Sequence, residues 1–587
     1  MVRLDRPDPL VGLDIHIAAR YLAGAPFGMK VVCQLLHPLL TASSQPPNGK
    51  IVETLGDPGR PDVAIRAIIR QYELADAFPP AVIAEADRYP VNPPLDEIER
   101  ELAAGRTDLR GMRLITIDGE DARDLDDAVS LERLNEQCFR LGVHLADVSH
   151  YVPENGILDL EARRRGTSVY LADRVLPMLP PRLSNGLCSL NPHVDRLALS
   201  VFLVIDSKGE ILDGQIDRTV IRSAARTSYQ EVYLALTEDQ VEPDRYPEFL
   251  DDLRQMQQLA NRLHKRRRQL GGIDFNLAET KIDLDDNGVP VSAYPEPHTF
   301  ANDIIEAFMI AANEYIANFA AAHKLPIIYR VHDRPDPDKL DCFLELASVY
   351  GLRSKRPSRP SAKDLALLLD QSSSELYGPA LSELLLRSMA KAEYSAENIG
   401  HFGLASLHYC HFTSPIRRYP DLFVHRTVKR YLDSPLNETQ KSTRTAAAAI
   451  AEWSSITERQ AMMAERDSVK QKAVEYMNRH LGETFGGMIS GFSNAGMIVQ
   501  LESTIEGMVL YRSLDGYIAF DEKRMQARNE SSGRVYSLGD QVVVQVARAD
   551  VTARQIDFTL MTHHGQRGSG QGRKTGGKGR RRKRFKS

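Results

Sequence analysis

The chain has 587 residues, of which 42% are hydrophobic and 26% are charged, and its formal net charge is −5 at pH 7. This composition is typical of a soluble globular protein with roughly three to four domains. No apolar run reaches the ~18 residues of a membrane span, and the N-terminus lacks the basic, apolar and small-residue blocks of a signal peptide. The five cysteines are scattered without a CxxC pair, which excludes a zinc ligand set and a disulfide framework and favours a reducing cytoplasm.

Short β-like runs dominate the two ends of the chain. Residues 1–95 contain GLDIHI, MKVVCQLL and GKIVETLG between Gly- and Pro-rich turns, followed by two helical segments. Short strands separated by turn signals predict a small barrel. Similar runs return after Leu481 and predict a second small barrel that ends near Met561. We therefore expect domains at 1–95, 96–480 and 481–562, with a tail at 563–587.

The central part changes from strands to helices along its length. Residues from about 100 to 235 are mostly β-like, and from about Val241 apolar residues recur at three-to-four spacing, which predicts helices. The clearest helical segments are 247–270, 300–323, 419–432 and 446–477. The expected fold is therefore a mixed α/β centre between two barrel-like ends.

An acidic run, IDGEDARDLDDA, occupies Ile117 to Ala128 and holds six carboxylates against one arginine. MRLITID before it and FRLGVHLADVSHYV after it both read as strands, so the run forms a tight connection between core strands. Crowded carboxylates repel one another unless a cation neutralises them, and Mg²⁺ is bound by carboxylates, waters and phosphates. From this segment alone, a metal site and a solvated acidic loop both remain open.

A second motif, HFTSPIRRYPDLFVHR, places Arg417 and Arg418 on a turn at a helix N-terminus. Guanidinium groups and exposed helix N–H groups form an anion site suited to phosphate, although paired arginines are more often surface residues. Together with the carboxylates, they indicate metal-assisted phosphodiester hydrolysis. Tyr170 and Phe275 lie where glycines and polar residues break the apolar pattern; base stacking and plain core packing are both open, and sequence alone favours core.

The tail from His563 to Ser587 has ten lysines and arginines and no acidic residue. It is Gly-rich with one aromatic residue, so we expect it to be disordered and to bind polyanions by counterion release. The alternatives are a solubility tail and nonspecific contact with ribosomal RNA.

Several long motifs together resemble the RNB family of 3′→5′ exoribonucleases, the ribonuclease II/ribonuclease R group, and within it the ribonuclease R branch. They are IDGEDARDLDDA, HLADVSHYV, GTSVYLADRVLPMLPPRLSNGLCSLNP, YRVHDRP and HFTSPIRRYPDLFVHR, and the resemblance extends from about Gly12 to Met561. It implies a mixed α/β RNB catalytic domain between a cold-shock-type and an S1 OB-fold barrel. Relative to full-length members, the chain would lack the N-terminal helix-turn-helix region and the first cold-shock domain.

The resemblance also implies roles for individual residues. Its Mg²⁺ ligands correspond to Asp118, Asp124, Asp126 and Asp127, with Asp126 most closely tied to cleavage, and its catalytic arginine corresponds to Arg417. Tyr170 and Phe275 correspond to the aromatic residues that bracket the stacked bases, and Glu465 to a glutamate against the terminal nucleotide. Glu306 lies where the family contacts the terminal ribose, in a region where alignment is less certain, and Arg418 is a further phosphate contact.

The expected activity is Mg²⁺-dependent, processive 3′→5′ hydrolysis of single-stranded RNA to 5′-nucleoside monophosphates, by a cytoplasmic monomer. RNA would enter between the small barrels, and ribosomes and RNA-decay proteins are further candidate partners. The S1-like segment carries Ala495 and Ile498 where stacking aromatics are common, which predicts weaker base stacking there. Two rivals stay open: a catalytically inactive RNA-binding relative and a metal-dependent DNA exonuclease.

Overall fold

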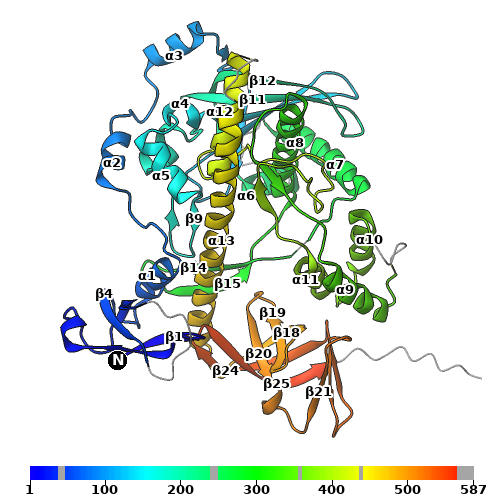
Figure 1. Ribbon diagram of the computed structural model, residues 1–587. Coiled ribbons are helices and arrows are strands. Elements are labelled where there is room, and N and C mark those ends of the chain that lie inside the picture. The colour runs from blue at the N-terminus through cyan, green and yellow to red at the C-terminus, as the bar shows by residue number, and fades with distance from the viewer. Residues whose placement is uncertain (38–45, 238–248, 276, 354–359, 435–439, 565–587) are drawn as a thin grey trace, which may run out of the picture.

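The computed structural model describes residues 1–37, 46–237, 249–275, 277–353, 360–434 and 440–564. A large α/β body occupies one half of the molecule, and two β-rich parts lie beside each other at its base (Figure 1). The long helix α13, Gln440–Asn478, runs through the body and ends at the base, where the C-terminal barrel begins. Within these ranges, none of the helices combines the length and the apolar composition needed to cross a bilayer.

The N-terminal part is a four-stranded sheet followed by three helices. Its strand order is β1-β2-β4-β3, and alternating residues of β2 and β4, including Ile15, Ile17 and Ile51, form a small apolar core. Sequence analysis located the last three strands and missed the first. The elements are β1 Val2–Asp8, β2 Gly12–Ile17, β3 Lys30–Leu35, β4 Asn48–Gly56, α1 Pro61–Gln71, α2 Pro80–Ala86 and α3 Leu95–Ala103.

A seven-stranded sheet of order β13-β6-β7-β8-β11-β12-β5 forms the centre of the body. Strand β11 pairs with β12 along its whole length and with β8 from Ala198 to Ile205, and its residues are almost all buried. Because β11 is covered on both faces, it reads as a continuous apolar run. The strands are β5 Thr107–Asp108, β6 Ile115–Asp118, β7 Asp127–Arg133, β8 Phe139–Ala146, β11 Asp195–Ile205, β12 Ile211–Arg222 and β13 Ala225–Ser228.

The strand expected over 139–152 is shorter than the sequence predicted. Strand β8 ends at Ala146, and Val148–Tyr151 form the short helix α4 instead. The cause is Asp147, which is fully buried and accepts from Arg106 Nη2 at 2.7 Å and from Lys429 Nζ at 2.7 Å. A buried carboxylate must be paired, so these two cations fix the chain where it leaves the sheet. They also hold the pKa of Asp147 well below its usual value against the opposing effect of burial.

Helices cover the sheet and extend the body away from it. Helix α8 is apolar on nearly all sides, and its core contacts include β8, β11 and α7. Helices α9 to α11 form a separate layer that shares a core with α13 and the C-terminal barrel. The helices are α5 Ile157–Arg165, α6 Tyr229–Thr237, α7 Leu250–Leu270, α8 Phe300–Ala322, α9 Pro337–Val349, α10 Ala362–Ser372, α11 Gly378–Ser388 and α12 Tyr419–Asp433. Three small ribbons complete the body: β9 Val169–Tyr170 with β10 Val175–Leu176, β14 Thr280–Leu284 with β15 Pro290–Pro295, and β16 Tyr329–Val331 with β17 Glu393–Ser395.

The C-terminal part is a closed five-stranded barrel of order β18-β19-β20-β25-β24 with a three-stranded side sheet. Strand β25 reaches His564, and His563 Nε2 lies 2.8 Å from Asp540 Oδ2 inside the barrel. The two histidines assigned to the tail therefore belong to the barrel, and the tail prediction for residues 565–587 lies outside the described residues. The strands are β18 Thr484–Phe492, β19 Gly496–Leu501, β20 Glu506–Leu510, β21 Ile518–Asp521, β22 Gln526–Asn529, β23 Val535–Ser537, β24 Gln541–Asp550 and β25 Gln555–His564.

Candidate active site

The acidic run connects β6 to β7, two neighbouring strands of the central sheet. The sequence predicted a connection between core strands but missed β7, which begins at Asp127, and placed the next strand only at Phe139. Side chains from distant segments fix the path of the acidic run. Arg226 Nη2 on β13 donates to the carbonyl oxygens of Glu120 and Ala122, both at 2.7 Å. Ser189 Oγ donates to the Arg123 carbonyl at 2.8 Å and accepts from Leu125 N at 3.1 Å. The path of the loop is therefore fixed by hydrogen bonds, although Gly119, Glu120, Asp121 and Arg123 are exposed to solvent.

Three of the four aspartates in this loop have a raised pKa. Burial raises the pKa of Asp118, and the charges of Asp127 and Asp124 add to the rise. Burial likewise raises the pKa of Asp126 and of Asp127, against the opposing charge of Arg417. Asp126 is the most buried of the four at 4% exposure, and its Oδ1 accepts from the backbone N–H of Ile416 at 2.8 Å. The loop therefore concentrates carboxylates whose ionised forms require a compensating cation.

The donor set fits a hard divalent cation. Asp118 Oδ2 and Asp126 Oδ2 are buried and receive no hydrogen bond from the described residues, and buried polar atoms without such partners are rare. Carboxylate oxygens are the ligands that Mg²⁺ and similar cations prefer. The four carboxylates are more widely spaced than the ligands of a compact metal site. In the described ranges, three ligand atoms lie within 4.8 Å of one another only in a different group of side chains, which is described below.

Arg417 and Arg418 lie on the turn before α12, with Arg418 at the N-cap of that helix. Arg417 is half exposed, and its Nε lies 3.5 Å from Asp126 Oδ2. Arg418 points the other way, and its Nη2 donates at 2.8 Å to Asp421 Oδ1, which is fully buried. The structure thus places Arg417 beside the aspartates and gives Arg418 a structural ion pair; its role as an RNA contact stays a prediction.

Tyr170 reaches the aspartates from the ribbon β9–β10. Its hydroxyl donates to Asp124 Oδ2 at 2.9 Å, and its backbone N–H donates to Glu465 Oε1 on α13 at 2.7 Å. The segment before Tyr170 pairs with the arginine turn, because Ser168 N donates to the Arg417 carbonyl at 2.9 Å. With 38% of its surface exposed, Tyr170 is not a core residue. Tyr170, Glu465, Arg417 and the aspartates therefore meet at one place.

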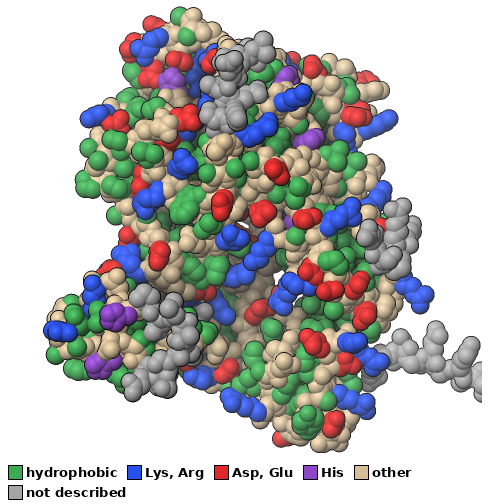
Figure 2. Space-filling view, in the orientation of Figure 1, with side chains coloured by type: hydrophobic (Ala, Val, Ile, Leu, Met, Phe, Trp, Pro, Cys, Tyr) green, Lys and Arg blue, Asp and Glu red, His purple; other side chains and the backbone are tan. Residues whose placement is uncertain are grey.

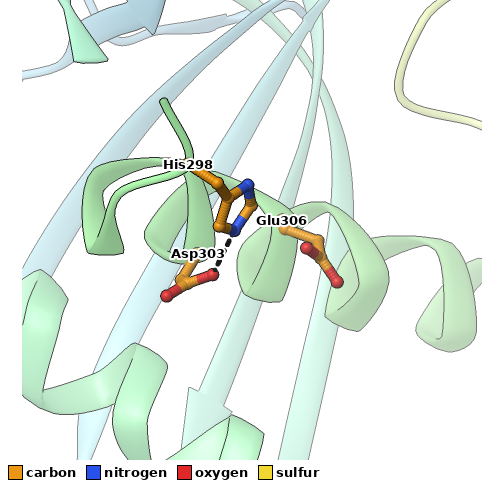
Figure 3. A group of neighbouring side chains, drawn as sticks. All are labelled: His298, Asp303 and Glu306. Atoms are coloured by element: carbon orange, nitrogen blue, oxygen red, sulfur yellow. Dashed lines mark hydrogen bonds and ion pairs between the residues drawn. The ribbon is translucent and has the colours of Figure 1, made fainter. Parts of the chain in front are cut away.

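Among the described residues, no contact joins Phe275 or Glu306 to the site formed by the aspartates, Arg417, Tyr170 and Glu465. Phe275 is half buried and packs against the core shared by α9–α11, α13 and the C-terminal barrel. Glu306, on α8, accepts from Arg267 Nη2 at 3.1 Å. It is also part of the compact ligand group, with His298 and Asp303 (Figure 3), where His298 Nε2 lies 2.8 Å from Asp303 Oδ1. Their predicted contacts with RNA stay predictions.

Sequence reasoning missed three residues that shape the site. Arg226 and Ser189 hold the acidic loop through the bonds described above, and the side chain of Tyr229, the first residue of α6, lies near Asp118 and Asp127. Burial, followed by the charges of these two aspartates, raises the pKa of Tyr229. The three-dimensional pairing of β13 with β6 brings Arg226 and Tyr229 to the loop, and Ser189 reaches it from the segment before β11, so the sequence offered no local signal for them.

Comparison with known proteins gives one consistent result. The RNB domain family matches residues 106–434, the cold shock domain family residues 7–79 and the S1 RNA binding domain family residues 480–560. Ribonuclease R of Thermotoga maritima is 40% identical over 94% of this chain and 78% of its own length. Ribonuclease R 1 of Lactococcus lactis is 39% identical over 87% of this chain. The matched part covers 62% of that relative's own length.

Solved structures show the same fold. Mycoplasma genitalium RNase R in complex with ribose methylated single-stranded RNA superposes with a TM-score of 0.86 at 26% identity, over 93% of this chain and 85% of that one. Yeast Ssd1, a pseudonuclease, superposes with a TM-score of 0.68 at 19% identity, over 87% of this chain and 64% of that one. Because a pseudonuclease shares the fold, the fold alone does not establish catalysis; the mixed α/β body between two OB-type barrels is nevertheless confirmed.

Proposed function

The chain belongs to the RNB family of 3′→5′ exoribonucleases, and from this premise we propose that it hydrolyses single-stranded RNA from the 3′ end. Water attacks the last phosphodiester, the bond from phosphorus to the 3′ oxygen of the preceding nucleotide breaks, and a 5′-nucleoside monophosphate leaves. The shortened RNA keeps a 3′ hydroxyl and is the next substrate, and we propose that it stays bound between cleavages, so that the reaction is processive. The main support is the meeting of four aspartates, Arg417 and Tyr170 at one end of the central sheet.

Each residue of the site has a proposed task. Asp118, Asp124, Asp126 and Asp127 would hold Mg²⁺, which when bound supplies an activated water and polarises the phosphate. Asp126 is fixed by the Ile416 amide through Oδ1, and its Oδ2, which accepts no hydrogen bond from the described residues, would be available to the cation. Arg417 offsets the charge that develops on the scissile phosphate.

Other residues hold the RNA strand. Tyr170 and Phe275 stack on bases, which is sequence-tolerant, so cleavage is expected to be nearly independent of sequence. Glu465, Glu306 and Arg418 are proposed contacts with the terminal nucleotides, and discrimination against DNA requires a 2′-hydroxyl contact. The proposed setting is a cytoplasmic monomer with domains at 1–95, 96–480 and 481–562 and a basic tail, with ribosomes and RNA-decay proteins as further partners.

The rival of an inactive relative is disfavoured by the site itself. All four aspartates and Arg417 are present, Asp126 is anchored by a backbone amide, and Arg417 lies within ion-pair distance of it. A catalytically silent protein has no need for this crowded carboxylate loop, since the buried charges destabilise the fold unless a cation is bound. The other rival function, a DNA exonuclease, is distinguished by testing whether the protein degrades RNA or DNA.

One assay tests the proposal. Purified protein is incubated with 5′-labelled single-stranded RNA and with DNA of the same sequence, in Mg²⁺ or in EDTA. We expect a ladder of RNA that shrinks from its 3′ end only in Mg²⁺, with 5′-monophosphates as the released product and intact DNA. An RNA ladder in EDTA, cleavage inside the strand, or degradation of the DNA would each contradict the proposal.

Replacing Tyr170 by alanine is expected to change the length of the final, undegraded oligonucleotide with little loss of rate on long RNA. The exposed ring lies at the aspartates, so it decides how many nucleotides remain held near the cleavage site, whereas long RNA keeps its other contacts. The measurement is a gel of limit products for the wild type, Tyr170→Ala and Tyr170→Phe. Phenylalanine retains the stacking face but not the hydroxyl that bonds Asp124, so it should leave the limit product unchanged.

The same variants separate stacking from packing. A core tyrosine would cost roughly 3–5 kcal/mol on truncation to alanine, and a destabilised enzyme would lose activity on every substrate equally. Thermal unfolding of the three proteins is measured on the same preparations. A Tyr170→Ala enzyme with a lower melting temperature and an unaltered limit product would exclude the stacking role.

A further inference from the structure

Arg554 connects three parts of the molecule from the turn between β24 and β25. Its side chain leaves the barrel and is buried at 5% exposure. The guanidinium pairs with Asp467 on α13, its Nε donates to Gln471 Oε1 at 3.1 Å, and its Nη2 donates to Gln71 Oε1 at 3.3 Å at the end of α1. One cation of the S1-like barrel therefore contacts the RNB body and the cold-shock part at once.

The acceptor at the centre of this junction is shared. Asp467 Oδ2 also accepts from the hydroxyl of Tyr72 at 3.1 Å, directly after α1. The carboxylate is thus held between a barrel residue and a residue of the cold-shock part. Arginine forms such multiple, directed contacts because its donors lie in a rigid plane, and lysine cannot reproduce them.

The backbone at Arg554 supports a specialised position. Its φ is +55°, in the left-handed region that residues with a side chain rarely adopt. Ala553 N donates to Asp550 Oδ1 at 2.9 Å and stabilises the turn. A strained turn persists where the surrounding structure fixes it, and here it directs the guanidinium into the junction.

The barrel has other attachments to the body, so the junction is not what keeps it folded. A continuous apolar core joins the barrel to α13 and to α9–α11, and Thr504 Oγ1 lies 2.7 Å from Thr280 Oγ1 of β14. The barrel core itself does not include Arg554. Loss of the arginine should therefore remove the direct bond between the barrel and Gln71 of α1, while the barrel stays on the body and α1 stays packed on α13.

The active site should also keep its geometry when Arg554 is replaced. Helix α1 packs Ile65, Ile68 and Ile69 against Val169 and Leu171, on either side of Tyr170, and against α13. Gln71 is not part of this apolar contact, whereas Tyr72 packs against its edge and also donates to Asp467, and neither Tyr72 contact involves Arg554. Tyr170 should therefore keep its place when the junction is broken.

We infer that Arg554 is a positioning residue that fixes the cold-shock part relative to the S1-like barrel and so sets the entrance for long RNA. The inference rests on the proposed function, in which RNA passes between the two barrels. Figure 2 shows a hollow between the body and the barrel at its base, with lysine and arginine side chains on its rim. When two single-strand binding surfaces are held at a fixed spacing, RNA bound to one is at a high effective concentration at the other. This gain in affinity is lost when the spacing varies.

The test compares Arg554→Gln with Arg524→Gln. Arg524 lies between β21 and β22 in the side sheet of the same C-terminal part and has an exposed ion pair with Asp521, so the control removes the same charge without touching the junction or its turn. Each protein degrades a long RNA in the presence of excess unlabelled competitor, and separately a tetranucleotide. For Arg554→Gln we expect about a tenfold fall in nucleotides removed per binding event, as for a lost linked site, with the tetranucleotide rate unchanged. The control should match the wild type on both.

Two further measurements distinguish a change in the position of the cold-shock part from a general loss of structure. Arg554→Lys retains the charge but not the planar donors and should resemble the glutamine variant on long RNA. Spin labels at Phe27 and Tyr517, exposed on the cold-shock part and the C-terminal part, in a background with Cys33→Ser, Cys138→Ser and Cys342→Ser, should show a broader distance distribution in Arg554→Gln. An equal loss on long and short RNA, or no loss on either, overturns the inference. A wild-type enzyme that degrades neither RNA overturns the proposed function instead.

Discussion

Replacing Asp126 by asparagine is expected to abolish hydrolysis while RNA binding stays intact or becomes tighter. The change removes one negative charge from the carboxylate loop and keeps the size of the side chain. Repulsion between the loop and the RNA phosphates falls, whereas the cation and the attacking water lose the ligand that the Ile416 amide orients. We expect the rate to fall by about a thousandfold or more, which corresponds to ~4 kcal/mol in the barrier.

The expected fold of this variant is the native one. The introduced asparagine can still accept from the Ile416 amide through its side-chain oxygen. A neutral side chain also avoids the free-energy cost of burying a charge, the effect that raises the pKa of Asp126. The rate is measured in single turnover at saturating enzyme, and affinity by fluorescence anisotropy in EDTA, where no cleavage interferes.

Asp121 provides the matched control. It lies in the same loop and is exposed, so Asp121→Asn makes the same chemical change without affecting the buried carboxylates. We expect wild-type rates for it. Retention of more than about a tenth of the wild-type rate by Asp126→Asn, a barrier change of ~1.4 kcal/mol or less, would remove Asp126 from the catalytic assignment.

Residues of the site that lie in one continuous motif could be predicted from the sequence. The aspartates lie together in the connection from β6 to β7, and the strand predicted before it, with the one predicted from Phe139, indicated that it belongs to the core, although β7 itself was missed. Arg417 could be placed because Pro415 and Pro420 define the turn and the start of α12. Both predictions depend on local signals that periodicity and turn residues report directly.

Contacts between distant segments could not be predicted. Arg226 reaches the acidic loop only because β13 pairs in parallel with β6, and no local pattern records that pairing. The end of β8 was missed for a similar reason, since Asp147 is balanced by cations far away in the chain. The different environments of Arg417 and Arg418 also depend on partners outside the motif, Asp126 for the first and the buried Asp421 for the second.

That difference leads to the second prediction, in which neighbouring arginines respond in opposite ways. Arg417→Gln is expected to lower the hydrolysis rate by about 10²–10³, as the loss of one donor at a developing charge does. Its melting temperature should stay near that of the wild type, because the Arg417 side chain is 43% exposed and exposed ion pairs contribute little to stability. Arg417→Lys keeps the charge but not the planar donors and should recover only part of the rate.

Arg418→Gln is expected to do the reverse. It leaves the Asp421 carboxylate buried with the Ser414 amide as its remaining described partner, and removing one member of a buried pair costs roughly 3–5 kcal/mol. The free energy of unfolding, measured by urea denaturation, should fall accordingly. At a temperature where the variant is folded, its single-turnover rate should stay within about threefold of the wild type, less than the ~1.4 kcal/mol that a tenfold change represents. A large rate loss in a fully folded Arg418→Gln enzyme would show instead that the proposed contact of Arg418 with the RNA acts in the chemical step, and a stable, fully active Arg417→Gln enzyme would transfer the catalytic assignment away from Arg417.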